Sequence, residues 1–264
     1  MTENRKRELL LALVPALCDE RGMEAGLGED ATTDELFSAF RALVNTRPPI
    51  PADSGWLAMQ DELLRGMIAD AGVTRVEDIP PAAADPRLRL WRGDITTLAA
   101  DAITNAANSQ MLGCWVPRHH CIDNAIHTFA GVQLRRACAE LMEAQGHEEP
   151  TGLAKITPAY NLPARHVIHT VGPIAQGRPT ARHRLQLAQC YRSCLDLAAR
   201  SGLTSVAFCC ISTGIFGFPQ EEAAEIAVRT VREWLDAHED AGVTVVFNVF
   251  GDADEAIYRS LLFT

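Results

Sequence analysis

The chain has 264 residues, of which 47% are hydrophobic and 22% charged, and its net charge is −10. These values are ordinary for a folded protein of one large domain, or one domain with an extension, and they exclude a disordered chain. The negative charge argues against generic nucleic-acid binding, because no cluster of Lys and Arg is available to neutralise phosphates. A bound phosphate would therefore be held locally, by backbone N–H groups and helix N-termini.

No targeting or membrane segment is evident. No apolar run approaches the roughly 20 residues that span a bilayer, and Glu3 and Glu8 interrupt the basic start, which is not typical of a signal peptide. The cysteines are scattered and do not form a disulfide framework; they are Cys18, Cys114, Cys121, Cys138, Cys190, Cys194, Cys209 and Cys210. We expect a cytoplasmic monomer with no membrane contact.

Residues 1–84 show helical patterning. Apolar residues at helical spacing predict helices over 5–20, 33–44 and 56–71. The proline-rich segment 80–86 cannot continue a helix and is interpreted as a linker. The sequence therefore predicts an N-terminal helical extension over 1–84 and a second domain over 85–264.

Beyond residue 85, short β-branched or aromatic runs alternate with helical ones. Strands are predicted over 88–91, 102–105, 155–158, 166–171, 205–211 and 244–250, and helices over 122–144, 186–201 and 219–237. This alternation predicts a three-layer α/β sandwich. Ligands bind such sheets at the carboxyl ends of the strands, so the loops after Asn105 and Ile211 should hold the site.

Two motifs follow predicted strands. The first is GDIT at 93–96, with DAITNAANS directly behind it; if Asp94 stood alone, it could simply cap a helix. Asn105 and Asn108 accompany it, and they leave the next strand for the loop region, where amides turn the chain or bind a ligand. In the second, STGIFGFP at 212–219, glycines allow a close backbone approach and consecutive N–H groups form an anion nest, while Phe216 can stack on a sugar or base. The alternative for this motif is an ordinary glycine turn.

The stretch 113–127, GCWVPRHHCIDNAIH, concentrates metal-binding side chains. Cys114, His119, His120 and Cys121 fall within a few residues before a helix. Thiolate and imidazole are the usual zinc ligands, and a site with three protein ligands keeps one position open for catalysis. The alternative is a pair of unrelated cysteines beside surface histidines. Cys209 and Cys210 are interpreted as core residues.

Of three further polar side chains in these segments, only Asp123 has both a functional and a structural interpretation. Asp123 lies in the first helical turn, where it either complements the helix dipole or orients a water or a ribose hydroxyl. His127 lies four residues on, on the same helix face, and is interpreted as a hydrogen-bonded inner residue. His169 is interpreted as a satisfied core histidine.

The motifs GDIT, DAITNAANS, IDNAIH and ISTGIFGFP, in this order over about residues 88 to 252, resemble the macrodomain family, whose members bind ADP-ribose. Hydrolytic macrodomains mostly have a glycine-rich run where this chain has Cys114 to Cys121. This departure resembles the zinc-dependent microbial branch, which also carries a helical N-terminal extension. The resemblance implies a three-layer α/β/α macrodomain sandwich with a mixed central sheet, over residues 85–264.

The resemblance also implies a site. Asp94 would bind the adenine amino group, the loop 212–216 would hold the diphosphate, and Phe250 to Asp252 would close over the adenine. The implied ADP-ribose contacts are Asp94, Ile95, Asn105, Asn108, Cys121, Ile122, Asp123, Ser212, Thr213, Gly214, Ile215 and Phe216. The implied zinc ligands are Cys114, His119 and Cys121, with His120 the alternative to His119, and the implied catalytic residues are Asp123 and Asn108.

The implied function is hydrolysis that removes mono-ADP-ribose from modified proteins, with Zn2+ as cofactor, and it is linked to sirtuin-like ADP-ribosyltransferases. In this hypothesis zinc makes a water easier to deprotonate and Asp123 orients that water. An ester to an acidic side chain is the expected linkage, because its hydrolysis needs only an activated nucleophile and a stabilised oxyanion. The alternatives are a non-catalytic ADP-ribose-binding module, a hydrolase of free esters such as O-acetyl-ADP-ribose or of a phosphorylated ADP-ribose, and a redox protein using Cys114 and Cys121.

Overall fold

The computed structural model describes residues 1–24, 26–28 and 30–263. The helices are α1 (Glu3–Asp19), α2 (Thr33–Asn45), α3 (Ser54–Ala71), α4 (Ile122–Ala130), α5 (Val132–Gln145), α6 (Ala181–Arg200), α7 (Gln220–Ala237) and α8 (Asp252–Phe263). The 3-10 helices are η1 (Val76–Asp78), η2 (Ile95–Thr97) and η3 (Glu239–Ala241). The strands are β1 (Thr74–Arg75), β2 (Pro81–Ala82), β3 (Asp85–Arg92), β4 (Leu98–Ala99), β5 (Ala102–Ala107), β6 (Ala154–Pro158), β7 (His166–Val171), β8 (Ser205–Phe208) and β9 (Thr244–Val249).

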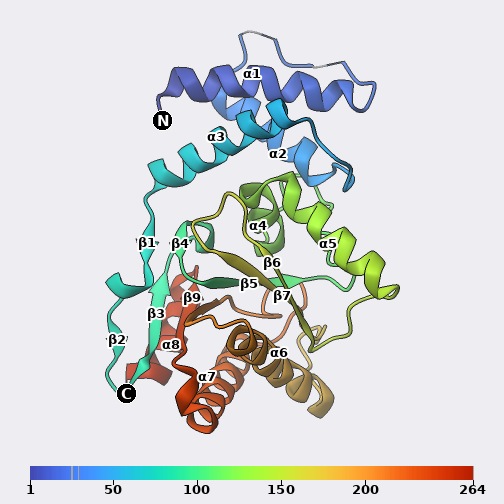
Figure 1. Ribbon diagram of the computed structural model, residues 1–264. Helices are drawn as coiled ribbons and strands as arrows, with labels where there is room; N and C mark the ends of the chain where they lie inside the picture. The colour runs from blue at the N-terminus through green and yellow to red at the C-terminus, as the bar shows by residue number, and fades with distance from the viewer. Residues whose placement is uncertain (25, 29, 264) are drawn as a thin grey trace.

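Within the described residues, seven strands form one sheet in the order β2-β3-β9-β8-β5-β7-β6. Neighbours are parallel except at the edges, where β2 pairs antiparallel with β3 and β6 with β7. Helices α4 and α5 lie on one face and α6 and α7 on the other (Figure 1). Because both faces are covered, inner strands such as β7 and β9 are buried along nearly their whole length. The predicted α/β sandwich with a mixed sheet is confirmed.

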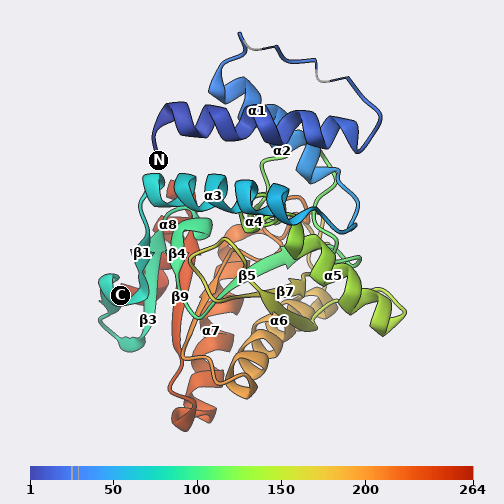
Figure 2. The same ribbon diagram turned by 45° about the horizontal axis from the view of Figure 1, so that its top comes forward.

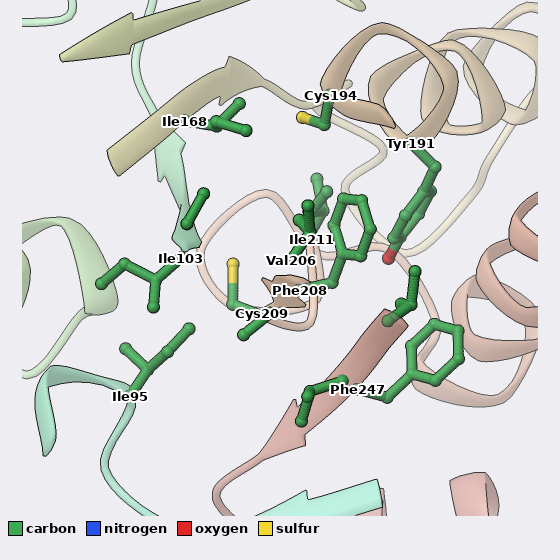
Figure 3. Packing of buried hydrophobic residues seen from close by; sticks show 14 of the residues in the cluster. Ile95, Ile103, Ile168, Tyr191, Cys194, Val206, Phe208, Cys209, Ile211 and Phe247 are labelled. Carbon is green, nitrogen blue, oxygen red and sulfur yellow. The ribbon is translucent and has the colours of Figure 1, made fainter. Parts of the chain in front are cut away.

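Aromatic side chains hold α6 and α8 against the sheet. Tyr191 of α6 packs beside Phe208 of β8 with ring centroids 4.9 Å apart, and both lie among the aliphatic side chains drawn in Figure 3. Phe247 of β9 packs against Tyr258 of α8 at 5.1 Å. All four rings are buried. Aromatic residues bury large areas each, so these pairs fix the layer on which the site is built.

Helices α1, α2 and α3 pack around a second hydrophobic cluster that includes Phe40 and Leu63. Phe129 of α4 packs against both clusters and so connects them. Figure 2 shows α3 between α1 and the sheet, and both α2 and α3 contact α4. The predicted N-terminal helical extension is therefore present, while the division into domains at 1–84 and 85–264 stays a prediction.

Two predicted segments differ from the structure. The helix predicted over 122–144 is two helices, because Gly131 adopts a φ of 97° and ends α4. The segment 80–86, predicted as a linker, contributes to the sheet instead. Pro81–Ala82 forms an edge strand against β3, and an edge is where a strand tolerates the missing N–H of proline.

Other boundaries shift by a few residues. Helix α6 begins at Ala181, before the predicted start at 186, because Thr180 and His183 form a capping box. The strand predicted over 205–211 ends at Phe208, and α8 was not predicted. Among the described helices, none combines the length and the apolar character that a membrane crossing requires.

Candidate active site

Three loops meet at one edge of the sheet. Strands β5, β7 and β8 are parallel neighbours, so their carboxyl ends lie together. The loops that follow them cover residues 108–121, 172–180 and 209–219. Ligands of α/β sheets bind at such an edge. The predicted site residues therefore lie mainly on loops whose positions the sheet determines.

The Cys and His side chains of the first loop gather at one point. Cys114 Sγ lies 3.6 Å from His119 Nδ1, and these atoms and Cys121 Sγ all lie within 4.8 Å of one another. Zinc bond lengths in a tetrahedral site imply separations of roughly 3.5 Å between N and S ligands and roughly 3.8 Å between two S ligands. The donor set therefore fits a zinc ion with one open position. His120 is exposed and lies outside this cluster.

Cys121 also caps helix α4. Its Sγ accepts a hydrogen bond from the Asn124 N–H at 3.4 Å. Burial raises the pKa of the Cys121 thiol to about 12, which makes the free thiol a weak nucleophile. A coordinated divalent cation deprotonates such a thiol. The free thiol in this environment is therefore poorly suited to redox chemistry.

Asp123 is buried beside the cluster, in the first turn of α4. Its Oδ1 accepts a hydrogen bond of 2.8 Å from Asn105 Nδ2. Burial raises the pKa of Asp123 to about 6, although the Asn105 hydrogen bond and the Arg135 charge act in the opposite direction. A carboxylate with this proton affinity is suited to accepting a proton from a water near neutral pH.

Asn105 lies inside β5 and is fully buried, so the expectation that it leaves the strand for the loop is wrong. It faces its register partner in β7, with Asn105 Nδ2 3.2 Å from His169 Nδ1. His169 Nε2 lies 2.9 Å from Thr157 Oγ1. The interpretation of His169 as a satisfied core histidine is confirmed. The contacts with Asp123 and His169 satisfy Asn105 Nδ2, whereas Asn105 Oδ1 is buried with no hydrogen-bond partner among the described residues.

His127 differs from its expected role. It is buried, and in the part of the chain that the structure describes neither ring nitrogen has a hydrogen-bond partner. Its Nε2 lies 3.6 Å from Asp123 Oδ1. The interpretation as a hydrogen-bonded residue is therefore wrong. Burial keeps the pKa of His127 well below its ordinary value, so the ring stays neutral.

The two polar residues before the Cys/His stretch shape turns. Asp94 is exposed and caps η2, with Oδ1 accepting from the Thr96 N–H at 2.9 Å and from the Thr96 hydroxyl at 2.8 Å. The adjacent Ile95 is buried. Asn108 follows β5, and its Nδ2 donates to the Gly113 carbonyl at 3.1 Å. Asn108 therefore links the end of β5 to the start of the Cys/His stretch.

The loop after β8 has the form of an anion nest. Among the described residues, no hydrogen bond engages the N–H groups of Gly214, Ile215 and Phe216. Ile215 is exposed and Ile122 is half-buried. Ser212 has a φ of 68° and a buried hydroxyl that finds no partner in the described part of the chain. Free N–H groups in succession favour a phosphate.

The loop after β7, residues 172–180, was not predicted as part of the site. Its Ala175 and Gln176 N–H groups donate to the Phe216 carbonyl at 2.8 and 3.0 Å, and so hold the loop after β8. Two arginines were also missed. Arg135 donates to the Leu112 carbonyl at 2.6 Å, and Arg41 of α2 donates to the His119 carbonyl at 2.9 Å. Neither lies near a motif that could have indicated it.

Comparison with known proteins identifies the family. Residues 104–227 match the Macro domain family. A protein-ADP-ribose hydrolase of Treponema medium is 50% identical over a 264-residue alignment that covers 99% of this chain and 100% of that relative. A Trypanosoma brucei macrodomain in complex with ADP-ribose is 31% identical, with a TM-score of 0.65 over 89% of this chain and 97% of that one. An Oceanobacillus iheyensis macrodomain with ADP is 40% identical, with a TM-score of 0.59 over 66% and 88%. With this identity and coverage, the chain belongs to the macrodomain family.

Proposed function

We propose that this chain is a protein-ADP-ribose hydrolase that removes mono-ADP-ribose from modified proteins with the help of a zinc ion. The observation that carries the proposal is the cluster of Cys114, His119 and Cys121 beside the buried carboxyl group of Asp123, at the strand ends of a macrodomain. The protein-ADP-ribose hydrolase that matches the chain along its whole length supports the same activity. The reaction class is metal-assisted hydrolysis.

In this mechanism separate groups of residues bind the substrate, activate the water and hold the metal. The N–H groups of Gly214 to Phe216 bind the diphosphate, and Asp94 and Ile95 contact the adenine. Asp123, oriented by Asn105, positions the attacking water and takes its proton, and Asn108 shapes the distal ribose site. Cys114, His119 and Cys121 would hold a zinc ion, which would supply a Lewis acid to lower the pKa of a nearby water.

The substrate linkage we propose is an ester to an acidic side chain, made by a sirtuin-like ADP-ribosyltransferase. Hydrolysis of an ester needs an activated water and a stabilised oxyanion and no strong acid for the leaving group. Scattered cysteines with no disulfide pairing support a reducing cytoplasm as the location. We propose that the protein acts there as a monomer.

The test compares the wild type with Cys114→Ala and Asp123→Ala. ADP-ribose release from a mono-ADP-ribosylated protein is followed over time, with and without chelator, and metal content is measured by mass spectrometry. Loss of a proton-transfer group costs typically about 10²–10⁴-fold in rate, so Asp123→Ala should release ADP-ribose at least about 100-fold more slowly while it keeps its zinc. Cys114→Ala should lose the zinc. Cys18→Ala, which removes a buried cysteine of the extension, is the control and should behave as wild type.

Other outcomes identify the rival functions. Binding of ADP-ribose without any release in the time course would indicate a binding module. Faster turnover of O-acetyl-ADP-ribose than of the modified protein would indicate a hydrolase of free esters. Activity that oxidants abolish and chelators leave intact would indicate a redox protein. Wild-type rates in both variants would refute the site.

A further inference from the structure

The stretch 113–121, which carries the three metal-binding side chains, contains no helix or strand. Its shape must therefore come from contacts with neighbouring elements. One face of helix α2 supplies several of them, through Ser38, Arg41 and Asn45. These residues are spaced three and four positions apart, which places them on one side of the helix. The N-terminal extension thus reaches the metal cluster directly.

Arg41 makes the central contact. Its Nη2 donates to the His119 carbonyl at 2.9 Å, and its Nη2 and Nε donate to Asn124 Oδ1 at 2.9 and 3.1 Å. Asn124 in turn donates its backbone N–H to Cys121 Sγ and its Nδ2 to the Val116 carbonyl. The Arg41 guanidinium is therefore bonded to the backbone of one proposed ligand, His119, and to Asn124, which contacts another proposed ligand, Cys121.

Asn45 holds the residue before His119. Arg118 has a φ of 58°, a backbone conformation that L residues rarely adopt. Its N–H donates to Asn45 Oδ1 at 3.0 Å, while Asn45 Nδ2 donates to Thr128 Oγ1 of α4 at 2.9 Å. The strained residue is thus held by Asn45 of α2, and the same Asn45 side chain is bonded to α4. A contact of this kind allows an unfavourable conformation to persist.

Arg135 fixes α2 to the other side of the same stretch. Its guanidinium donates to the carbonyls of Val44 and Asn45 at the end of α2, at 2.9 and 2.7 Å. The guanidinium carbon also lies 4.2 Å from the centroid of the Trp115 ring. The start of the stretch and the end of α2 therefore share one buried cation, so the two cannot move independently.

We propose that helix α2 is part of the metal centre and that Arg41 is a positioning residue, which sets the orientation of His119 and Cys121 and so raises the affinity for zinc. This inference rests on the zinc site of the proposed function. Residues that orient metal ligands typically change metal affinity or activity by about 10–100-fold when they are replaced. A purely structural role for Arg41 would lower the stability of the extension and leave the zinc affinity of the folded protein unchanged.

The experiment measures zinc affinity in the full chain by competition with a chromogenic chelator, for wild type, Arg41→Gln and Arg41→Lys. Arg5→Gln is the matched control, because Arg5 of α1 also donates through two nitrogens, to Glu62 at 2.7 Å each, but contacts no part of the metal cluster. Circular dichroism checks folding. Cobalt(II) titration adds a spectroscopic readout, since its visible absorption reports the geometry of the ligands.

We expect Arg41→Gln to bind zinc about 10–100-fold more weakly than wild type and to give a weaker cobalt spectrum. The zinc affinity of Arg41→Lys should lie between those of wild type and Arg41→Gln, because lysine keeps the charge and can still donate a hydrogen bond but lacks the planar guanidinium. Arg5→Gln should bind as wild type does. If Arg41→Gln does not fold, the zinc affinity of Arg41→Lys is compared with those of wild type and Arg5→Gln instead. Wild-type zinc affinity in the folded variant overturns the inference and leaves the proposed function intact. A wild-type chain that binds no zinc overturns both.

Discussion

Gly113 begins the Cys/His stretch in a conformation that no other residue fits well. Its φ is 78°, and a Cβ there would lie 2.8 Å from the ring of His127. In Gly113→Ala, backbone strain at positive φ costs about 1–2 kcal/mol, and overpacking against the buried ring costs about 1–3 kcal/mol more. We expect a loss of about 2–5 kcal/mol in the free energy of unfolding, measured by chemical denaturation.

Gly146 offers a matched control for this substitution. It has a φ of 74°, and a Cβ there would meet nothing within 4 Å. Gly146→Ala should therefore lose only the strain of about 1–2 kcal/mol. Equal losses in the two variants would show that the His127 ring gives way and that this ring does not constrain the start of the stretch.

Single residues also show where sequence is informative and where it is not. Cys114, His119 and Cys121 are close in sequence, so a local pattern is enough to propose them as one cluster, and the fold places His119 but not His120 in it. The contact between Asn105 and His169 depends on the register of β5 against β7, which no local pattern contains. The available signal would be two polar residues at matching positions of two strands that are both predicted to be buried.

At the scale of elements, the loop after β7 supports the loop after β8. A Cβ at Gly172 would lie 2.1 Å from Ser212 Oγ and 2.9 Å from Ile211 Cγ2, and Ser212 is buried. Gly172→Ala should therefore displace the anion nest. We expect at least about a tenfold loss of ADP-ribose affinity, equivalent to about 1.4 kcal/mol, by isothermal titration calorimetry.

Gly26→Ala serves as the comparison, because a Cβ at Gly26 meets nothing within 4 Å. It should bind ADP-ribose as the wild type does. An undiminished ADP-ribose affinity in Gly172→Ala would mean that the loop after β7 moves to make room for the added methyl group. The anion nest would then not depend on the packing of that loop against Ser212.

Elements with strong local patterns were predicted, and those set by context were not. The inner strands and α7 follow from runs of apolar residues and their period. The break at Gly131 was missed because a lone glycine inside a helical pattern can be tolerated or can end the helix. The edge strand Pro81–Ala82 was missed because proline disfavours strands everywhere except at an edge, and an edge is a property of the whole sheet.

At the scale of the whole molecule, Phe129 of α4 connects the two hydrophobic clusters, and Arg41 and Asn45 of α2 contact the Cys/His stretch. The helices of the extension were predictable from sequence, but their contact with the metal cluster was not, because Arg41 and His119 are far apart in the chain. Two neutral buried histidines, His127 and His169, make the stability of the fold depend on pH.

Burial lowers the pKa of His169 to about 3 from its ordinary value of 6.5, and burial also lowers that of His127. The unfolded chain takes up a proton at His169 as pH falls through about 6.5, whereas the folded chain stays neutral until near pH 3. The contribution of His169 to the free energy of unfolding is therefore fully present above about pH 6.5. Below that pH it declines by up to about 1.4 kcal/mol per pH unit. His169→Gln should make the fall in unfolding free energy between pH 6.5 and 4 shallower, measured by urea denaturation at each pH. His147→Gln, at an exposed position, should leave the slope as it is. An unchanged slope in His169→Gln would mean that His169 is protonated as readily in the folded chain as in the unfolded one.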